Sequence, residues 1–105
     1  MTDKELLELA AKAAKLDFVP SEGGSFGFSN GVLYKPWNPL RNDGEALRLA
    51  VKLGIQIWHR PGGVEGIHSG SILTKPQTEP LTPDPYAATR RAIVRAAAEI
   101  GKAIP

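Results

Sequence analysis

The stretch Trp37-Asn-Pro-Leu-Arg-Asn-Asp-Gly-Glu-Ala-Leu-Arg-Leu-Ala-Val-Lys-Leu53 joins a rigid turn to a well-capped amphipathic helix. Prolines on both sides of Trp37 forbid a helix there and favour a fixed turn. The helix begins after Asn42, a good N-cap, with Glu45 three residues later as in a capping box, and Gly54 ends it. Its polar stripe contains only Glu45, Arg48 and Lys52. Because so narrow a stripe leaves most of the surface apolar, we expect this helix to be largely buried.

Two further helices are predicted, one at each end of the chain. Thr2 can cap a helix over residues 3–15, and Glu5 completes a capping box. The last helix runs from about Asp84 or Pro85 to Ala103, since aspartate is a good N-cap and proline suits the first turn. In both segments apolar residues recur with the helical period, which is typical of helices that cover a core.

The segments between the helices have the composition of β-strands. Asn30-Gly31 between apolar runs predicts a β-hairpin from Ser25 to Tyr34. Alternating β-rich residues predict a strand over Ile55–Arg60, and a weaker strand is expected from Ile67 to Leu73. Residues 74–85 contain four prolines and are expected to be extended or irregular.

Three amphipathic helices and about four strands need both faces of one sheet to bury their apolar sides. The predicted fold class is therefore α/β, a three-layer α/β/α sandwich with a small, mainly antiparallel sheet. The chain has 105 residues, enough for one compact domain, so residues 1–105 are predicted to form a single domain. A chain this short has a modest core, and we therefore expect a homo-oligomer.

Composition and charge exclude several classes of protein. There is no cysteine, which excludes disulfides, thiolate catalysis and cysteine-based zinc sites. The 13 basic and 11 acidic residues leave a net charge of +2, too small an excess to indicate nucleic-acid binding by itself. No apolar run is long enough to span a bilayer, and the N-terminal residues lack the features of a signal peptide. We therefore expect a cytoplasmic protein with no membrane partner.

One residue of the last helix breaks its amphipathic pattern. Arg90 falls on the apolar side, beside Tyr86, where an unpaired charge would cost several kcal/mol. Two interpretations are open: the guanidinium pairs with a carboxylate of the same chain, or it binds a ligand anion such as a phosphate. Arg91 and Arg95 are expected on the opposite, solvated face, where Arg95 and Glu99 have the spacing of an ion pair.

The large aromatic and histidine side chains give weaker signals. Trp58 is expected to belong to the core, whereas Trp37, held between prolines, is interpreted as a loop anchor, a pocket wall or part of a subunit interface. His59 and His68 have no third ligand at a recognisable spacing, and no serine occupies a nucleophile elbow. No metal, cofactor or catalytic residue is therefore expected.

Two loops, Ser21–Ser25 and Pro61–Gly66, are rich in glycine. Neither matches a P-loop or a dinucleotide fingerprint, so they are either weak phosphate cradles or plain hairpin connections. The candidate ligand-binding residues, gathered from all these signals, are Arg90, Trp37, Tyr86, Arg48, Gly23, Gly24, Gly62 and Gly63.

Two segments carry a family resemblance. One is residues 37–53, and the other is Tyr86-Ala-Ala-Thr-Arg-Arg-Ala-Ile-Val-Arg-Ala-Ala-Ala-Glu-Ile-Gly101. Together with the N-terminal helix they resemble the phage ABA sandwich domain family. The resemblance covers nearly the whole chain and implies an α/β/α sandwich and a small accessory protein of tailed phages or prophages. It implies no catalytic residues.

The leading hypothesis is a phage-encoded, non-enzymatic binding protein in the cytoplasm of the bacterial host. It would act in counter-defence by sequestering an anionic, nucleotide-like signal molecule in a pocket at an oligomer interface. One alternative is an inhibitor that binds a host protein through a surface patch. Another is a nucleic-acid-binding accessory protein that uses Arg91, Arg95 and Lys102, although the charge balance disfavours nucleic acid. An enzyme is the least expected class.

Overall fold

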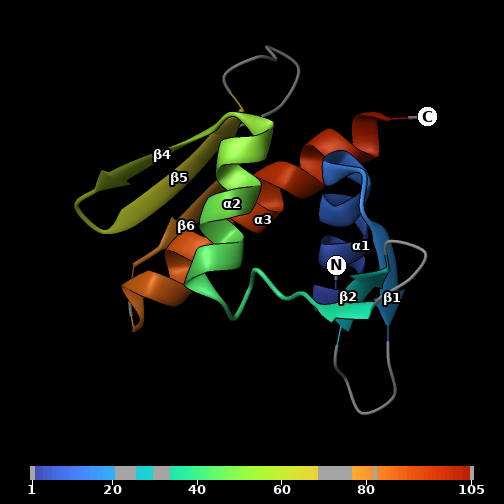
Figure 1. The fold of residues 1–105 in the computed structure, drawn as a ribbon. Helices are drawn as coiled ribbons and strands as arrows, with labels where there is room; N and C mark the ends of the chain where they lie inside the picture. The colour runs from blue at the N-terminus through green and yellow to red at the C-terminus, as the bar shows by residue number, and fades with distance from the viewer. Residues whose placement is uncertain (1, 21–25, 30–33, 69–76, 82, 105) are drawn as a thin grey trace.

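The computed structural model describes residues 2–20, 26–29, 34–68, 77–81 and 83–104 (Figure 1). The helices of these ranges are α1 (Asp3–Ala14), α2 (Asp43–Leu53) and α3 (Pro85–Ala103). The strands are β1 (Asp17–Pro20), β2 (Phe26–Ser29), β3 (Tyr34–Pro36), β4 (Ile55–Arg60), β5 (Gly63–His68) and β6 (Gln77–Pro80).

The helices begin at the caps that the sequence predicts. The Thr2 hydroxyl, the Asn42 side-chain oxygen and the Asp84 carboxylate each accept hydrogen bonds from backbone N–H groups of the first turn. Gly54 ends α2 in the left-handed conformation with φ 68°, and Lys15 ends α1 with φ 60°. Because these caps satisfy backbone groups that a helix leaves without partners, the local sequence is enough to fix the helix ends.

The strands form two three-stranded antiparallel sheets, of order β1-β2-β3 and β4-β5-β6. The first sheet lies beside α1, and the second packs against α3 (Figure 1). The predicted α/β class and antiparallel pairing are confirmed. The strands are divided between two sheets, however, where the sequence analysis expected one.

The long helix α3 lies at the centre, and both α1 and α2 pack against it (Figure 1). Two glycines allow the closest approaches. A Cβ atom on Gly101 would lie 2.0 Å from the carbonyl oxygen of Leu9 on α1, and a Cβ on Gly66 of β5 would lie 2.5 Å from that of Ala92. Residues of all three helices share one core cluster, so the helices bury their apolar faces against one another as well as against strands.

The predicted hairpin is present, but its register differs from that of a two-residue turn. Ser29 pairs with Tyr34, so residues 30–33 separate the paired ends, whereas a turn at Asn30-Gly31 alone would pair Ser29 with Val32. Residues 30–33 themselves lie outside the described parts of the chain.

The second sheet differs from its prediction in the start of β5 and gains a third strand, β6. β5 begins at Gly63 rather than at Ile67, because Pro61 and Gly62 (φ 81°) are enough to turn the chain. β6 lies in the segment that was expected to be extended or irregular, and the structure gives the extended alternative. It is an edge strand that ends at Pro80, and the edge of a sheet is where a proline is tolerated. The part of the weaker strand predicted beyond residue 68 lies outside the described ranges.

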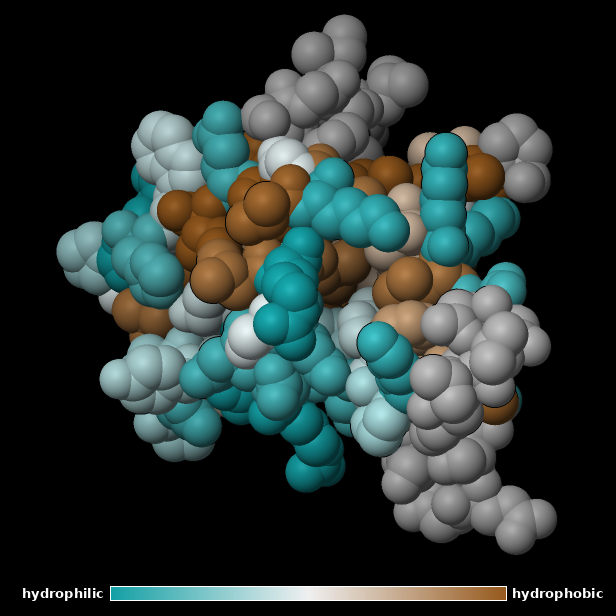
Figure 2. All heavy atoms as spheres, viewed as in Figure 1, coloured by the Kyte–Doolittle hydropathy of each residue, from teal (hydrophilic) through white to brown (hydrophobic). Residues whose placement is uncertain are grey.

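The prediction that α2 is largely buried is wrong. Only Ala46, Leu49 and Ala50 of this helix are buried, whereas Leu47 is 59% and Val51 74% exposed. Trp58, expected in the core, is half exposed. Figure 2 shows hydrophobic residues gathered on the surface over α2 and the neighbouring part of β4. The sequence periodicity shows that most of the α2 surface is apolar. It does not show whether other parts of the same chain cover that surface.

Candidate functional site

A cleft of about 390 Å³ lies between α2 and the first sheet. Its apolar floor comes from five parts of the fold: the end of α1, β2, the end of β3, the turn before α2, and α2 itself. The apolar lining residues are Ala14, Leu16, Phe28, Pro36, Trp37 and Leu49. The charged lining residues are Lys35, Glu45, Arg48 and Lys52. Two of the residues predicted from the sequence, Trp37 and Arg48, therefore meet at one site.

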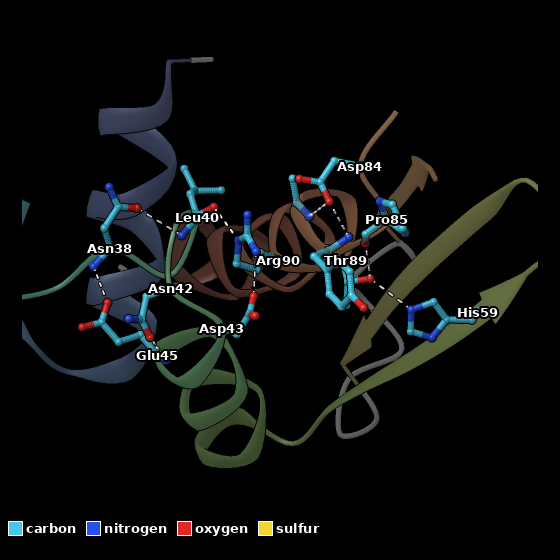
Figure 3. Close-up of polar contacts among 12 residues, drawn as sticks. Asn38, Leu40, Asn42, Asp43, Glu45, His59, Asp84, Pro85, Thr89 and Arg90 are labelled. Carbon is cyan, nitrogen blue, oxygen red and sulfur yellow. Dashed lines mark hydrogen bonds and ion pairs between the residues drawn. The ribbon is translucent and has the colours of Figure 1, made fainter. Parts of the chain in front are cut away.

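Trp37 is fixed by its surroundings. The side chain is almost fully buried, and its ring meets Phe18 edge-on, with ring centroids 6.5 Å apart and planes at 78°. The flanking turn is held by Asn38, whose side-chain oxygen accepts a hydrogen bond from the N–H of Leu40 at 3.1 Å (Figure 3). Of the three roles considered for Trp37, the structure combines loop anchor and pocket wall.

Three cations line this cleft, and none of them has a partner among the described residues. Lys35 pairs in register with Phe28, so both side chains project from the same face of the first sheet. Arg48 and Lys52 are one helical turn apart on α2, and both are exposed. The Arg48 guanidinium extends along the helix toward Gly44, where a Cβ atom would lie 3.4 Å from Nη1.

The cleft differs from the rest of the described surface, because most other basic side chains there have a hydrogen-bond or ion-pair partner. In the described parts of the chain, the basic side chains without any polar partner are Lys15, Lys35, Arg41, Arg48 and Lys52. Three of these five line the cleft, and Lys15 directly precedes its lining residue Leu16. Among the described residues, the cations without a polar partner are therefore concentrated at one apolar hollow.

Glu45 is the one carboxylate among the described residues that line this cleft. Its Oε2 accepts a hydrogen bond from the backbone N–H of Asn38 at 2.6 Å, and its own N–H donates to Asn42 Oδ1 at 2.9 Å (Figure 3). The side chain is thus committed to closing the turn before α2. Since a charge-assisted hydrogen bond of this kind fixes the carboxylate, Glu45 shapes the cleft and forms no ion pair with Arg48 or Lys52, although its negative charge stays in the lining.

Arg90 is paired inside the chain. Its Nη1 lies 2.6 Å from Asp43 Oδ1, and its Nε donates to the carbonyl oxygen of Leu40 at 2.9 Å (Figure 3). The first of the two interpretations of Arg90 is therefore confirmed, because its guanidinium has a carboxylate partner in the same chain. Its function in the structure is to tie α3 to the turn and first residues of α2, and it does not line the 390 Å³ cleft.

The remaining predicted site residues that the structure describes do not line this cleft. Tyr86 is 70% exposed in the first turn of α3, so its predicted place on a buried face is wrong. Gly62 and Gly63 belong to the turn between β4 and β5 and line none of the cleft. Gly23 and Gly24 lie outside the described residues.

The basic residues of the nucleic-acid hypothesis are also paired. Arg95 lies 2.7 Å from Glu79 of β6, Arg91 bridges Asp3 and Glu79, and Lys102 pairs with Glu99. The expected pair of Arg95 with Glu99 is therefore replaced by a contact with β6. This face of α3 is not simply solvated, because β6 and α1 supply its counter-charges.

A histidine–hydroxyl contact lies at the other end of α3. His59 Nε2 is 3.0 Å from Thr89 Oγ1, and this hydroxyl donates to the carbonyl oxygen of Pro85 at 2.8 Å (Figure 3). Because the hydroxyl proton is already committed to the helix backbone, the pair does not have the arrangement of a base-activated nucleophile. Among the described residues no group of three histidine, cysteine or acidic side chains could hold a metal ion.

Comparison with family models, with curated proteins and with solved structures finds no match to this chain. The resemblance to the phage ABA sandwich domain family therefore stays a prediction from the sequence. Among the described helices, none has the length and apolar character that crossing a membrane requires.

Sequence reasoning missed Lys35 and Lys52 as site residues. Lys52 had a usable signal, since it follows Arg48 by one helical turn on a narrow polar stripe. Lys35 had none, because its proximity to α2 depends on the pairing of β3 with β2. The residues around Lys35 do not by themselves determine which strand β3 pairs with or in which register.

Proposed function

We propose that this chain is a small, non-enzymatic binding protein that captures an anionic, nucleotide-like molecule in the cleft beside α2. The observation that carries the proposal is the gathering of three cations, Lys35, Arg48 and Lys52, around an apolar floor, none of them with a polar partner in the part of the chain that the structure describes. Cations that lack internal partners favour an external anion, and the apolar floor favours a ligand with a flat, poorly hydrated part.

The size and shape of the cleft support a ligand of this class. Its volume of about 390 Å³ falls in the lower part of the range of about 300–1,000 Å³ that small-molecule sites occupy. A phosphate would meet the cationic rim, which can form charge-assisted hydrogen bonds, and a base would lie against Trp37 and Phe28. Because Glu45 is held by Asn38, one wall is preorganised.

In biological terms we propose the role predicted from the sequence: a phage accessory protein that acts in the bacterial cytoplasm and removes a nucleotide signal of host defence by stoichiometric binding. The resemblance of residues 37–53 and 86–101 to phage accessory proteins supports the setting, and the cleft supports the ligand class. The nucleic-acid alternative is weaker, because the three cations on which it depended are paired within the chain.

The test is titration calorimetry, with thermal shift as a second readout, against a panel of cyclic dinucleotides, cyclic mononucleotides and ADP-ribose-type nucleotides. We expect one of them to bind, and Arg48→Ala and Lys52→Ala each to weaken that binding roughly tenfold, which corresponds to about 1.4 kcal/mol. The matched control is Lys4→Ala, which removes the same charge near the start of α1, away from the α1 residues that line the cleft. No binding by any member of the panel would refute the proposal. An equal effect of all three substitutions would reduce it to non-specific attraction.

A further inference from the structure

We propose that two copies of this chain associate through the outer edge of β4, so that the second sheet of each copy continues into the other. This inference concerns a surface outside the cleft and does not depend on the proposed function. Three observations support this proposal. β4 differs in composition from the other edge strands, its one cation is paired within the same sheet, and an apolar surface lies beside it.

β4 differs from the other edge strands of the described sheets. Strands β1, β3 and β6 have four, three and four residues, and each contains a proline and a charged side chain. Short length, prolines and charges are the devices by which proteins prevent an edge strand from pairing with another chain. β4 has six residues, Ile55-Gln-Ile-Trp-His-Arg60, and no proline, lysine or acidic residue. Among the described strands, β4 is therefore the edge strand that is neither short nor interrupted by a proline, and its one charged residue is Arg60.

The single cation of β4 does not block pairing. Arg60 Nε lies 3.4 Å from Glu65 on the neighbouring strand, and the guanidinium carbon lies 5.7 Å from the centre of the Trp58 ring. Its charge is thus balanced within the same sheet. In an antiparallel pairing of β4 with its own copy centred on Ile57, Gln56 would face Trp58 of the second copy, and no two like charges would be opposed.

An apolar surface lies next to this edge. α2 packs against both α3 and β4, and the side of α2 that these contacts leave uncovered carries Leu47 and Val51, one helical turn apart. Ile57 of β4 is only partly buried, and Figure 2 shows hydrophobic residues continuing from α2 toward β4. We call Leu47, Val51 and Ile57 the α2–β4 surface. Pairing of two β4 edges would bring the α2–β4 surfaces of both copies to the same junction and remove them from water.

The experiment is a measurement of molar mass by light scattering over a range of concentrations, combined with hydrogen exchange. We expect twice the mass of one chain at high concentration, and slower amide exchange in β4 at high than at low concentration, with no such change in β6. Val51→Glu and Leu47→Glu should each restore the monomer while leaving the far-UV circular dichroism unchanged, since both side chains are exposed. Ile104→Glu, which places the same charge on an exposed apolar residue at the other end of the molecule, is the matched control and should stay dimeric.

Each other outcome overturns the proposal. A monomer at all concentrations shows that β4 is a tolerated free edge. A dimer whose β4 amides exchange equally fast at all concentrations associates through another surface.

Discussion

Replacement of Gly101 by alanine tests the packing of α1 on α3 most directly. Gly101 is buried in the last turns of α3, and α1 crosses it there so closely that the added Cβ atom would lie 2.0 Å from the Leu9 carbonyl oxygen and 2.8 Å from its carbonyl carbon. An ordinary contact of this kind needs about 3.5 Å, so the two helices would have to separate by roughly 1.5 Å. The obstacle is helix backbone rather than the end of a flexible side chain.

Two opposing effects set the magnitude of the change. Alanine is favoured over glycine inside a helix by about 1 kcal/mol. Overpacking of a well-packed interface costs about 1–3 kcal/mol, and a clash with backbone belongs at the upper end of that range. We therefore expect Gly101→Ala to lower the free energy of unfolding by about 2 kcal/mol, or the melting temperature by roughly 10 °C for a domain of this size.

The assay is urea and thermal unfolding followed by circular dichroism, with Gly44→Ala as the control. Gly44 is also helical, but a Cβ there would lie 3.4 Å from the flexible Arg48 side chain and from Asn42 Oδ1. The same chemical change at Gly44 should be neutral or stabilising by up to about 1 kcal/mol. A Gly101→Ala variant as stable as the parent chain would show that α1 and α3 are not in this close contact.

Further substitutions test the polar contacts. Asp84→Ala should lower the free energy of unfolding by about 1 kcal/mol in urea titrations, because the carboxylate accepts from two N–H groups at the start of α3. Asp43→Ala should lower the free energy of unfolding by no more than about 1 kcal/mol, since Asp43 is 71% exposed. Arg90→Ala should lower it by about 2 kcal/mol, because this change also removes the hydrogen bond to the Leu40 carbonyl oxygen and buried contacts. Equal losses of stability in the two variants would contradict this expectation. Glu79→Gln should cost about 1–2 kcal/mol, below the value for a fully buried pair, because its partner Arg95 is 37% exposed.

Local chemistry made the helices predictable. The ends of α2 follow from Asn42 and Gly54 alone, and the start of α3 follows from Asp84 and Pro85, because a cap and its N–H partners lie within one turn of chain. The division of the strands into two sheets did not follow in the same way. β6 owes its place to pairing with β5 and to the contact of Glu79 with Arg95, and neither partner is near it in sequence.

Burial was predictable only where a pattern has a single explanation. The apolar stripe of α1 is buried as expected, because α3 covers it. The apolar residues of α2 exceed what α3 and β4 can cover, so Leu47 and Val51 remain in water although the periodicity is that of a buried helix. An amphipathic pattern shows which residues favour burial. It does not show whether the surface that buries them belongs to the same chain.

The charged residues show how far the candidate site could be predicted from the sequence. Arg90 was conspicuous because it interrupted an apolar face, yet a cation in such a position is stable when the fold supplies polar partners, here the Leu40 carbonyl oxygen and the exposed carboxylate of Asp43. Arg48 and Lys52 were inconspicuous because exposed helix positions tolerate any charge, and for the same reason the fold was not obliged to neutralise them. A cation available to a ligand is therefore expected among residues that the local pattern treats as ordinary. It becomes recognisable only when the three-dimensional structure places several of them, here with Lys35, around one apolar hollow.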